Sequence, residues 1–237
     1  AENSLIPYAL FVSFFPKIIQ GPIALQWEMV PQFIDKAKSR FDSENFAKGL
    51  FLIAMGLFKK LVIADNLAVW AAQGYDHAQV LNFFEAWFTM LGYTFQLYFD
   101  FSGYTDMAIG VGYMFNIRIP DNFNSPYKSL NYQDVWRRWH ITLGRFLREY
   151  IYIPLGGSRH GELRTYLNLL LTFIIGGLWH GAAWTFVLWG AMNGLGLMVH
   201  RIWRKTGLRM HWLIAWSITF MFWNITEVMW RAVNYKA

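Results

Sequence analysis

The chain has 237 residues, of which 55% are hydrophobic, 19% are aromatic and only 15% are charged, whereas soluble domains carry about 25% charged residues. We therefore expect a multi-pass membrane protein. The net charge of +6 comes from basic residues that lie between apolar stretches, a pattern that orients membrane proteins and does not favour nucleic-acid binding. The absence of cysteine excludes disulfides, thiol catalysis and thiolate metal sites.

The first third of the chain alternates apolar stretches with polar connections. Residues 5–25 are apolar but contain two prolines, which predicts a kinked or re-entrant segment and not a straight span. Residues 27–45 are polar, mixed in charge and expected at the surface. Residues 46–72 are apolar yet carry Lys59 and Lys60 near their centre. Either two short helices meet there, or the lysines face protein or water.

Two carboxylates follow a spanning candidate at residues 80–99. Asp100 and Asp106 stand on either side of Ser102 in an otherwise apolar stretch. Their spacing does not place both on one helix face, so structural ion pairs or hydrogen bonds are favoured over an acid–base dyad. Lining of a substrate cavity is the alternative. Ser102 is not in a G-x-S-x-G motif, so a serine hydrolase has little support.

Residues 118–164 are the most polar part of the chain and are expected on the cytoplasmic side. His140 is a candidate for chemistry at the edge of a cluster of arginines. These arginines suit phosphate groups, either of lipid headgroups or of a phosphorylated donor, and the sequence favours neither. The cluster consists of Arg137, Arg138, Arg145 and Arg148.

Residues 165–200 contain no Asp, Glu, Lys or Arg, and a basic cluster lies on either side of them. If both clusters are cytoplasmic, the run must enter and return as two pieces. If the run crosses once, one cluster breaks the orientation rule. The sequence leaves both possibilities open. Residues 212–230 form a last apolar segment.

His180 stands in the middle of the charge-free run, next to several glycines. An ionisable side chain in an apolar membrane segment is a functional candidate by default. The glycines at positions 176, 177 and 181 would let a broken helix or a close approach expose the imidazole. The alternative is a structural histidine bonded to a neighbouring carbonyl. No metal site is expected, because His140, His160 and His180 are irregularly spaced and no H-E-x-x-H motif is present.

Several motifs resemble the membrane-bound O-acyltransferase family, and in particular its bacterial alginate O-acetyltransferase branch. The resemblance covers roughly residues 5–204, with the motifs in the family's order. They are residues 14–17 with 21–22, 99–108, 136–143, 152–157 and 177–181. Members of this family are considerably longer. We therefore expect residues 1–237 to belong to a single membrane domain, with further segments before and after.

The resemblance implies an all-α, polytopic helical bundle with re-entrant or broken helices around a tunnel. It implies an inner-membrane acyltransferase that moves an acetyl group from a cytoplasmic thioester such as acetyl-coenzyme A toward an exported polysaccharide. Alginate is the first choice of acceptor, with peptidoglycan second and D-alanylation of teichoic acid third. No bound cofactor is expected. The implied partners are the lipid bilayer and an extracytoplasmic SGNH-type acetyltransferase.

The same resemblance assigns roles to residues. His180 is the expected general base, kept neutral by burial, and His140 positions the donor or the acceptor. Trp179 and Trp184 are expected to exclude water. The rival from another class is a channel or transporter with Lys59, Asp100, Asp106 and His180 as its polar path. Donor or substrate binding is expected of Trp179, Trp136, Arg137, Arg138, Arg145, Arg148, Asp100, Ser102 and Asp106.

Overall fold

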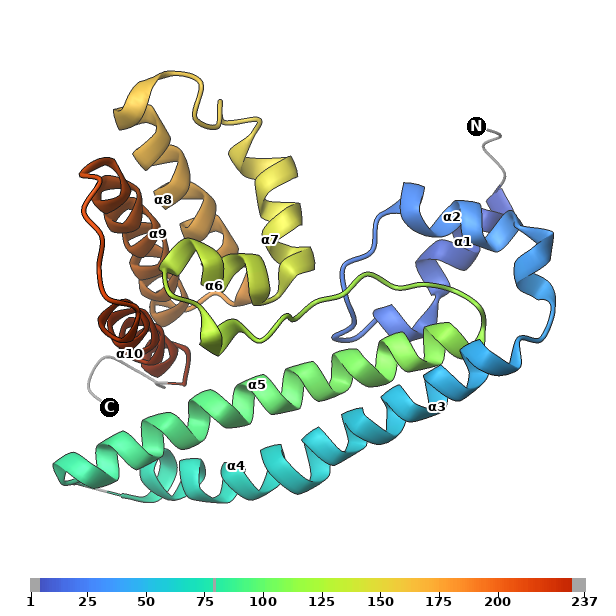
Figure 1. The fold of residues 1–237 in the computed structure, drawn as a ribbon, viewed down its shortest axis with the longest axis horizontal. Coiled ribbons are helices and arrows are strands. Elements are labelled where there is room, and N and C mark those ends of the chain that lie inside the picture. Colours follow the sequence, from blue (N-terminus) through green and yellow to red (C-terminus); the bar gives the residue numbers. More distant parts are fainter. Residues whose placement is uncertain (1–4, 79, 232–237) are drawn as a thin grey trace. The chain divides into compact units, whose positions relative to one another are not determined.

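The computed structural model describes residues 5–78 and 80–231, which are helical and contain no strand (Figure 1). They form two compact units. Of the described residues, unit 1 comprises 5–70 and 95–122, and unit 2 comprises 71–78, 80–94 and 123–231. The all-α class is therefore confirmed. In the described part of the chain, no single helix combines the length and the apolar character needed to cross a membrane.

Unit 1 contains the kink that its prolines predict. Helix α1 ends at Ser13, and Pro16 lies in a short 3-10 turn that leads into extended chain. A small apolar core forms around Met29 and Ile109. The helices that lie in this unit, or begin in it, are α1 (Leu5–Ser13), η1 (Phe15–Lys17), α2 (Gln26–Ile34), η2 (Lys36–Ser39), α3 (Ser43–Leu57), η3 (Phe58–Ala64) and α4 (Asp65–Ala72).

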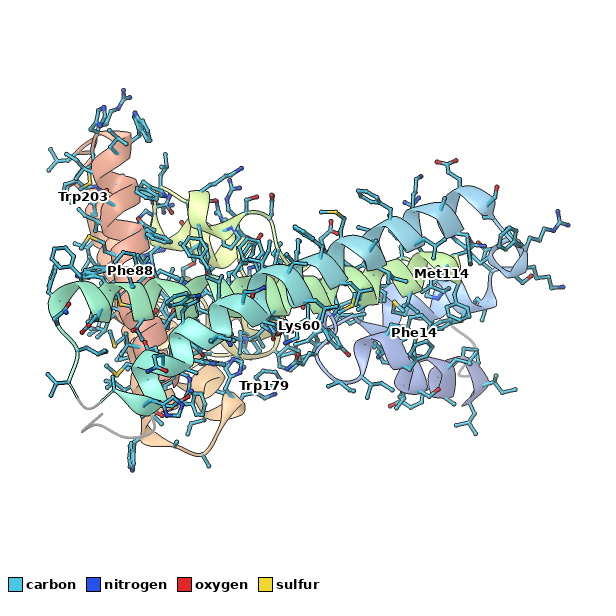
Figure 2. All side chains as sticks on the ribbon, turned by 90° about the horizontal axis from the view of Figure 1, so that it is seen from below. Phe14, Lys60, Phe88, Met114, Trp179 and Trp203 are labelled. Carbon is cyan, nitrogen blue, oxygen red and sulfur yellow. The ribbon has the colours of Figure 1, made fainter. Side chains whose placement is uncertain are left out.

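Helix α5 (Phe83–Met114) is longer than the sequence predicts, because it continues without a break past Asp100 and Asp106. Its first part belongs to unit 2 and its second part to unit 1. Many large apolar side chains remain exposed on the molecule. Phe88 on α5 and Trp179 on α8 are two of them, with exposed fractions of 73% and 58% (Figure 2).

Unit 2 holds a helical hairpin that decides between the two alternatives for residues 165–200. The run is split into α8 (Gly161–His180) and α9 (Trp184–Lys205), joined by three residues, so it returns on itself. The two backbones approach closely because Gly177 lies against Phe186 and Gly190 lies against Phe173. At the other end of the hairpin, Glu162 forms ion pairs with Arg201 and Lys205.

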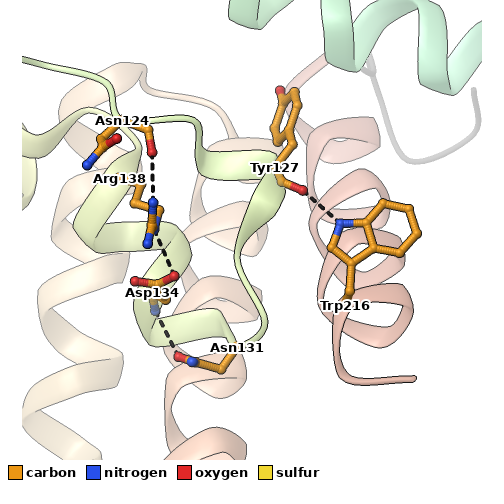
Figure 3. Close-up of polar contacts among 6 residues, drawn as sticks. All are labelled: Asn124, Tyr127, Asn131, Asp134, Arg138 and Trp216. Atoms are coloured by element: carbon orange, nitrogen blue, oxygen red, sulfur yellow. Dashed lines mark hydrogen bonds and ion pairs between the residues drawn. The ribbon is translucent and has the colours of Figure 1, made fainter. Parts of the chain in front are cut away.

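Four of the remaining elements of unit 2 contact this hairpin, namely α6, α7, η6 and α10. Tyr127 joins α5 to α10, since its hydroxyl donates to the Thr94 carbonyl. Its own carbonyl accepts from the Trp216 indole N–H (Figure 3). These elements are η4 (Gln73–His77), η5 (Pro126–Lys128), α6 (Tyr132–Arg138), α7 (Ile141–Leu147), η6 (Arg148–Tyr152) and α10 (Trp212–Arg231).

Candidate functional site

His180 is the last residue of α8, immediately before the break at Gly181. Its ring is half-buried and lies edge-to-face against two indoles from other helices. The ring centroids are 5.5 Å from Trp189 on α9 and 4.4 Å from Trp230 on α10. The imidazole therefore sits where three helices meet, with aromatic rings on its sides and part of its surface accessible.

The two tryptophans that the sequence points to near His180 are placed differently. Trp179 contacts the His180 ring at 4.7 Å between centroids, although it is largely exposed. Trp184 begins α9 with 72% of its surface exposed, and it is not among the rings in contact with His180. Sequence reasoning missed Trp189 and Trp230. No local motif marks them, because they reach the histidine only through helix packing.

His140 lies in the corner between α6 and α7 with 6% of its surface exposed. Its backbone is left-handed, with φ 42°, a conformation that His, Asn and Asp adopt more readily than most residues. Burial, with a smaller electrostatic contribution from His180, lowers the pKa of His140 to about 3. His140 is therefore neutral at physiological pH, and the two predicted histidines lie within electrostatic range of each other.

A cavity of about 520 Å³ opens beside α6, η6 and α9, and five arginines line it. Arg201 is already paired with Glu162 through two hydrogen bonds of 3.0 Å. Arg137, Arg148 and Arg204 have no carboxylate partner among residues 5–78 and 80–231. The cavity is thus rich in uncompensated positive charge and suits an anionic ligand.

The cavity gathers three of the four arginines that the sequence singles out, Arg137, Arg145 and Arg148. Arg138 does not line it. Its guanidinium instead bonds Asp134 at 2.8 Å and the Asn124 carbonyl at 3.3 Å (Figure 3).

Three further cavity residues, His200, Arg201 and Arg204, were missed. Arg201 and Arg204 belong to the basic cluster that follows residues 165–200, and His200 is the last residue of that run. That cluster was visible in the sequence, but it could be placed beside the first only with knowledge that α8 and α9 form a hairpin.

Trp136 connects the cavity to the surroundings of His180. It lines the cavity together with Phe173, and their ring centroids are 4.7 Å apart. It also contacts Trp189 at 5.9 Å, and Trp189 contacts His180. Phe173 lies two helical turns before His180 on α8, about 10 Å along the axis. These packed rings, which we call the aromatic wall, link the cavity lining at Trp136 and Phe173 to the imidazole through Trp189, which is buried and does not line the cavity.

The predicted residues of unit 1 form a separate charged group. The Asp106 carboxylate lies 2.6 Å from Lys59 Nζ, and the Asp100 carboxylate lies 2.6 Å from Lys60 Nζ. These are the ion pairs that the sequence favoured. The lysines lie in the π-helical turn η3. Ser102 is buried, and its hydroxyl has no hydrogen-bond partner among the described residues.

No cluster of three or more potential metal ligands occurs in the part of the chain that the structure describes. The chemistry available at this place in unit 2 includes the imidazoles of His140 and His180, an aromatic wall and a cavity lined by arginines. This combination suits proton transfer beside a bound molecule that carries anionic groups.

Comparison with known proteins gives consistent matches. The sequence model of the membrane-bound O-acyltransferase family matches residues 2–232. Peptidoglycan O-acetyltransferase of Helicobacter pylori is 57% identical, over 99% of this chain and 45% of its own length. Probable alginate O-acetylase AlgI of Azotobacter vinelandii is 43% identical, over 98% and 48%. Teichoic acid D-alanyltransferase of Bacillus subtilis is 27% identical, over 90% and 58%. The chain spans about half the length of the curated relatives it matches.

Proposed function

The chain belongs to the membrane-bound O-acyltransferase family, as its motifs predict, and we propose that it carries the acyl-transfer site of a multi-pass inner-membrane enzyme. In this proposal an acyl group, most simply acetyl, moves from a thioester donor to a hydroxyl of a cell-envelope polysaccharide. The observation that carries the proposal is the arginine-lined cavity, whose aromatic wall leads to His180.

The cavity supports a donor that bears phosphate groups. Arg137, Arg148 and Arg204 come from three different helices, and guanidinium groups bind phosphate through paired N–H donors. Coenzyme A has phosphates at one end and the thioester at the other, joined by a long flexible arm. With the phosphates at the arginines, the arm would pass Trp136 toward His180. Lipid headgroups would need the charge but not the aromatic wall, so we favour donor binding.

His180 is the general base in the proposed reaction. Its imidazole accepts the proton of the acceptor hydroxyl while the hydroxyl oxygen attacks the thioester carbonyl carbon. The C–S bond then breaks, and the leaving thiolate takes up the proton, so the products are an ester and a free thiol. Trp189 and Trp230 limit access of water to the thioester. His140, neutral through burial, positions the donor or the acceptor by hydrogen bonding.

The names and identities of the relatives support an order of preference among acceptors. The relative named for peptidoglycan is 57% identical, and the relatives named for alginate are 42–43% identical. We therefore place peptidoglycan first and alginate second, which reverses the order that the motifs alone favoured. D-alanylation of teichoic acid, at 27% identity, remains third. In all cases we propose a tunnel that opens to both membrane faces and, for acetylation, an extracytoplasmic SGNH-type partner.

A channel or transporter is the alternative from another class. It would use Lys59, Asp100, Asp106 and His180 as its polar path, but both carboxylates are already ion-paired with lysines. Incubation of the purified full-length protein with radiolabelled acetyl-coenzyme A separates the two. An acyltransferase transfers or hydrolyses the acetyl group, and a transporter does neither.

The proposal is tested by His180→Ala in the full-length protein, with the exposed His211→Ala as the matched control. We expect His180→Ala to abolish O-acetylation of peptidoglycan and alginate, measured by mass spectrometry of the purified polymers. The amount of protein in the membrane should stay the same. His211→Ala should retain full acetylation. Full acetylation in the His180 variant would refute the assigned role of this histidine.

A further inference from the structure

Asn193 lies in the middle of α9 with none of its surface exposed. Its Oδ1 accepts two hydrogen bonds, from the Tyr132 hydroxyl at 2.6 Å and from the Trp136 indole N–H at 3.1 Å. Its Nδ2 donates to the carbonyl of Trp189 at 2.7 Å. An indole N–H can only donate, so the side-chain oxygen must face Trp136, and the orientation of the amide is fixed by chemistry.

The two donors that Asn193 accepts from occupy one face of α6. Tyr132 and Trp136 are four residues apart, and α6 also carries Arg137 into the cavity. Tyr132 is held further by an edge-to-face contact with Phe222, with centroids 4.9 Å apart. A single amide on α9 therefore gives both Tyr132 and Trp136 a directional contact, in addition to the ring contacts that pack them.

This matters because Trp136 belongs at once to the cavity and to the rings that lead to His180. Without the Asn193 oxygen, two buried donors would lose their acceptor, which is costly for any buried polar group. The indole would lose the hydrogen bond that orients it, and its ring contacts with Phe173 and Trp189 would remain as weaker restraints. The most direct consequence would be an altered contact between the Trp136 ring and a ligand bound in the cavity.

We infer that Asn193 is a positioning residue that holds Trp136 at the inner end of the arginine cavity and so sets how tightly the acyl donor binds. The inference rests on the proposed function, because it takes the cavity as the donor site. Asn193 itself touches no reacting atom in this arrangement. Its effect is on the donor KM more than on the chemical step.

The experiment compares Asn193→Leu, Asn193→Asp and Asn224→Leu in the full-length purified protein. Leucine keeps the approximate shape but offers no acceptor, whereas aspartate keeps an oxygen acceptor. Asn224 on α10 is the matched control. It is equally buried, accepts from the Thr94 hydroxyl and donates to the Phe220 carbonyl, and it does not line the cavity. The readouts are kcat and KM for acetyl-coenzyme A, together with thermal stability.

We expect Asn193→Leu to raise the KM for acetyl-coenzyme A roughly 10-fold, the factor that corresponds to one lost hydrogen bond. Asn193→Asp should stay nearer to wild type. Asn224→Leu should lower stability and leave the KM within about twofold of wild type. If Asn193→Leu does not fold, Asn193→Ser, whose shorter side chain stops before the indole, is judged by the same criteria.

Two results would overturn the inference while leaving the proposed function intact: an unchanged KM in the Asn193 variant, or an equal rise in KM in the Asn224 variant. A wild-type protein that turns over no acetyl-coenzyme A would instead overturn the proposed function, and this inference with it.

Discussion

The buried imidazole of His140 makes a quantitative prediction about stability and pH. Its pKa is about 3 in the folded chain and 6.5 when exposed. The unfolded chain therefore binds the proton more tightly. The stability that depends on a neutral His140 is fully present above about pH 6.5 and is lost as the pH falls toward 3. At about pH 5.5 the loss is RT ln(1 + 10), or about 1.4 kcal/mol, and about one pH unit lower it is about 2.7 kcal/mol.

The substitution that isolates this effect is His140→Asn, because asparagine tolerates the left-handed backbone at this position and does not titrate. Between about pH 7.5 and pH 5.5, wild type should lose about 1.4 kcal/mol more than the variant, which lowers its melting temperature more than that of the variant. The measurement is thermal unfolding of the purified full-length protein in detergent at both pH values. The exposed His211→Asn serves as the control. Equal pH dependence in wild type and the His140 variant would refute the reasoning, since His140 would then titrate as an exposed histidine does.

Two further predictions concern the cavity and the hairpin. Arg204→Ala should raise the KM for acetyl-coenzyme A by about 5- to 10-fold, with a smaller effect at high salt, because one exposed charge-assisted bond to phosphate is lost. Arg164 is an exposed arginine outside the cavity, so Arg164→Ala should leave the KM unchanged. An equal rise in KM in the Arg164 and Arg204 variants in steady-state assays would contradict the donor assignment. Gly190→Ala should destabilise unit 2 by about 1–3 kcal/mol in thermal melts, because its methyl group meets the backbone of α8. In Gly176→Ala the added methyl group meets only a flexible leucine side chain, so this variant should lose less stability. A larger loss of stability in Gly176→Ala than in Gly190→Ala would contradict the packing described.

Much of the candidate site could be predicted from local sequence. The glycines around His180 indicated a broken helix, and the break occurs immediately after it. The clustering of Arg137, Arg145 and Arg148 indicated an anion site, and all three line one cavity. These predictions succeed because each depends on residues that are near one another in the chain.

The rest depends on contacts between distant segments. The sequence placed a spanning candidate at residues 80–99, yet α5 continues through Asp100 and Asp106, where lysines from another helical segment neutralise the carboxylates. Likewise, Trp230 lies 50 positions after His180 and reaches it only through the packing of α10. Asn193 carries no motif at all. Its importance follows from what α6 places against it.

The hairpin of α8 and α9 is closed in two different ways. At the His180 end the chain itself joins the helices through three residues, whereas at the far end Glu162 joins them through charge. Concentrated salt weakens only the ion pairs of Glu162. Fraying of the two helices therefore starts at that end and proceeds toward the His180 end. The His180 imidazole therefore lies at the end of the hairpin that is not the first to open. Amide exchange measured against ionic strength would record this as a gradient of protection along both helices.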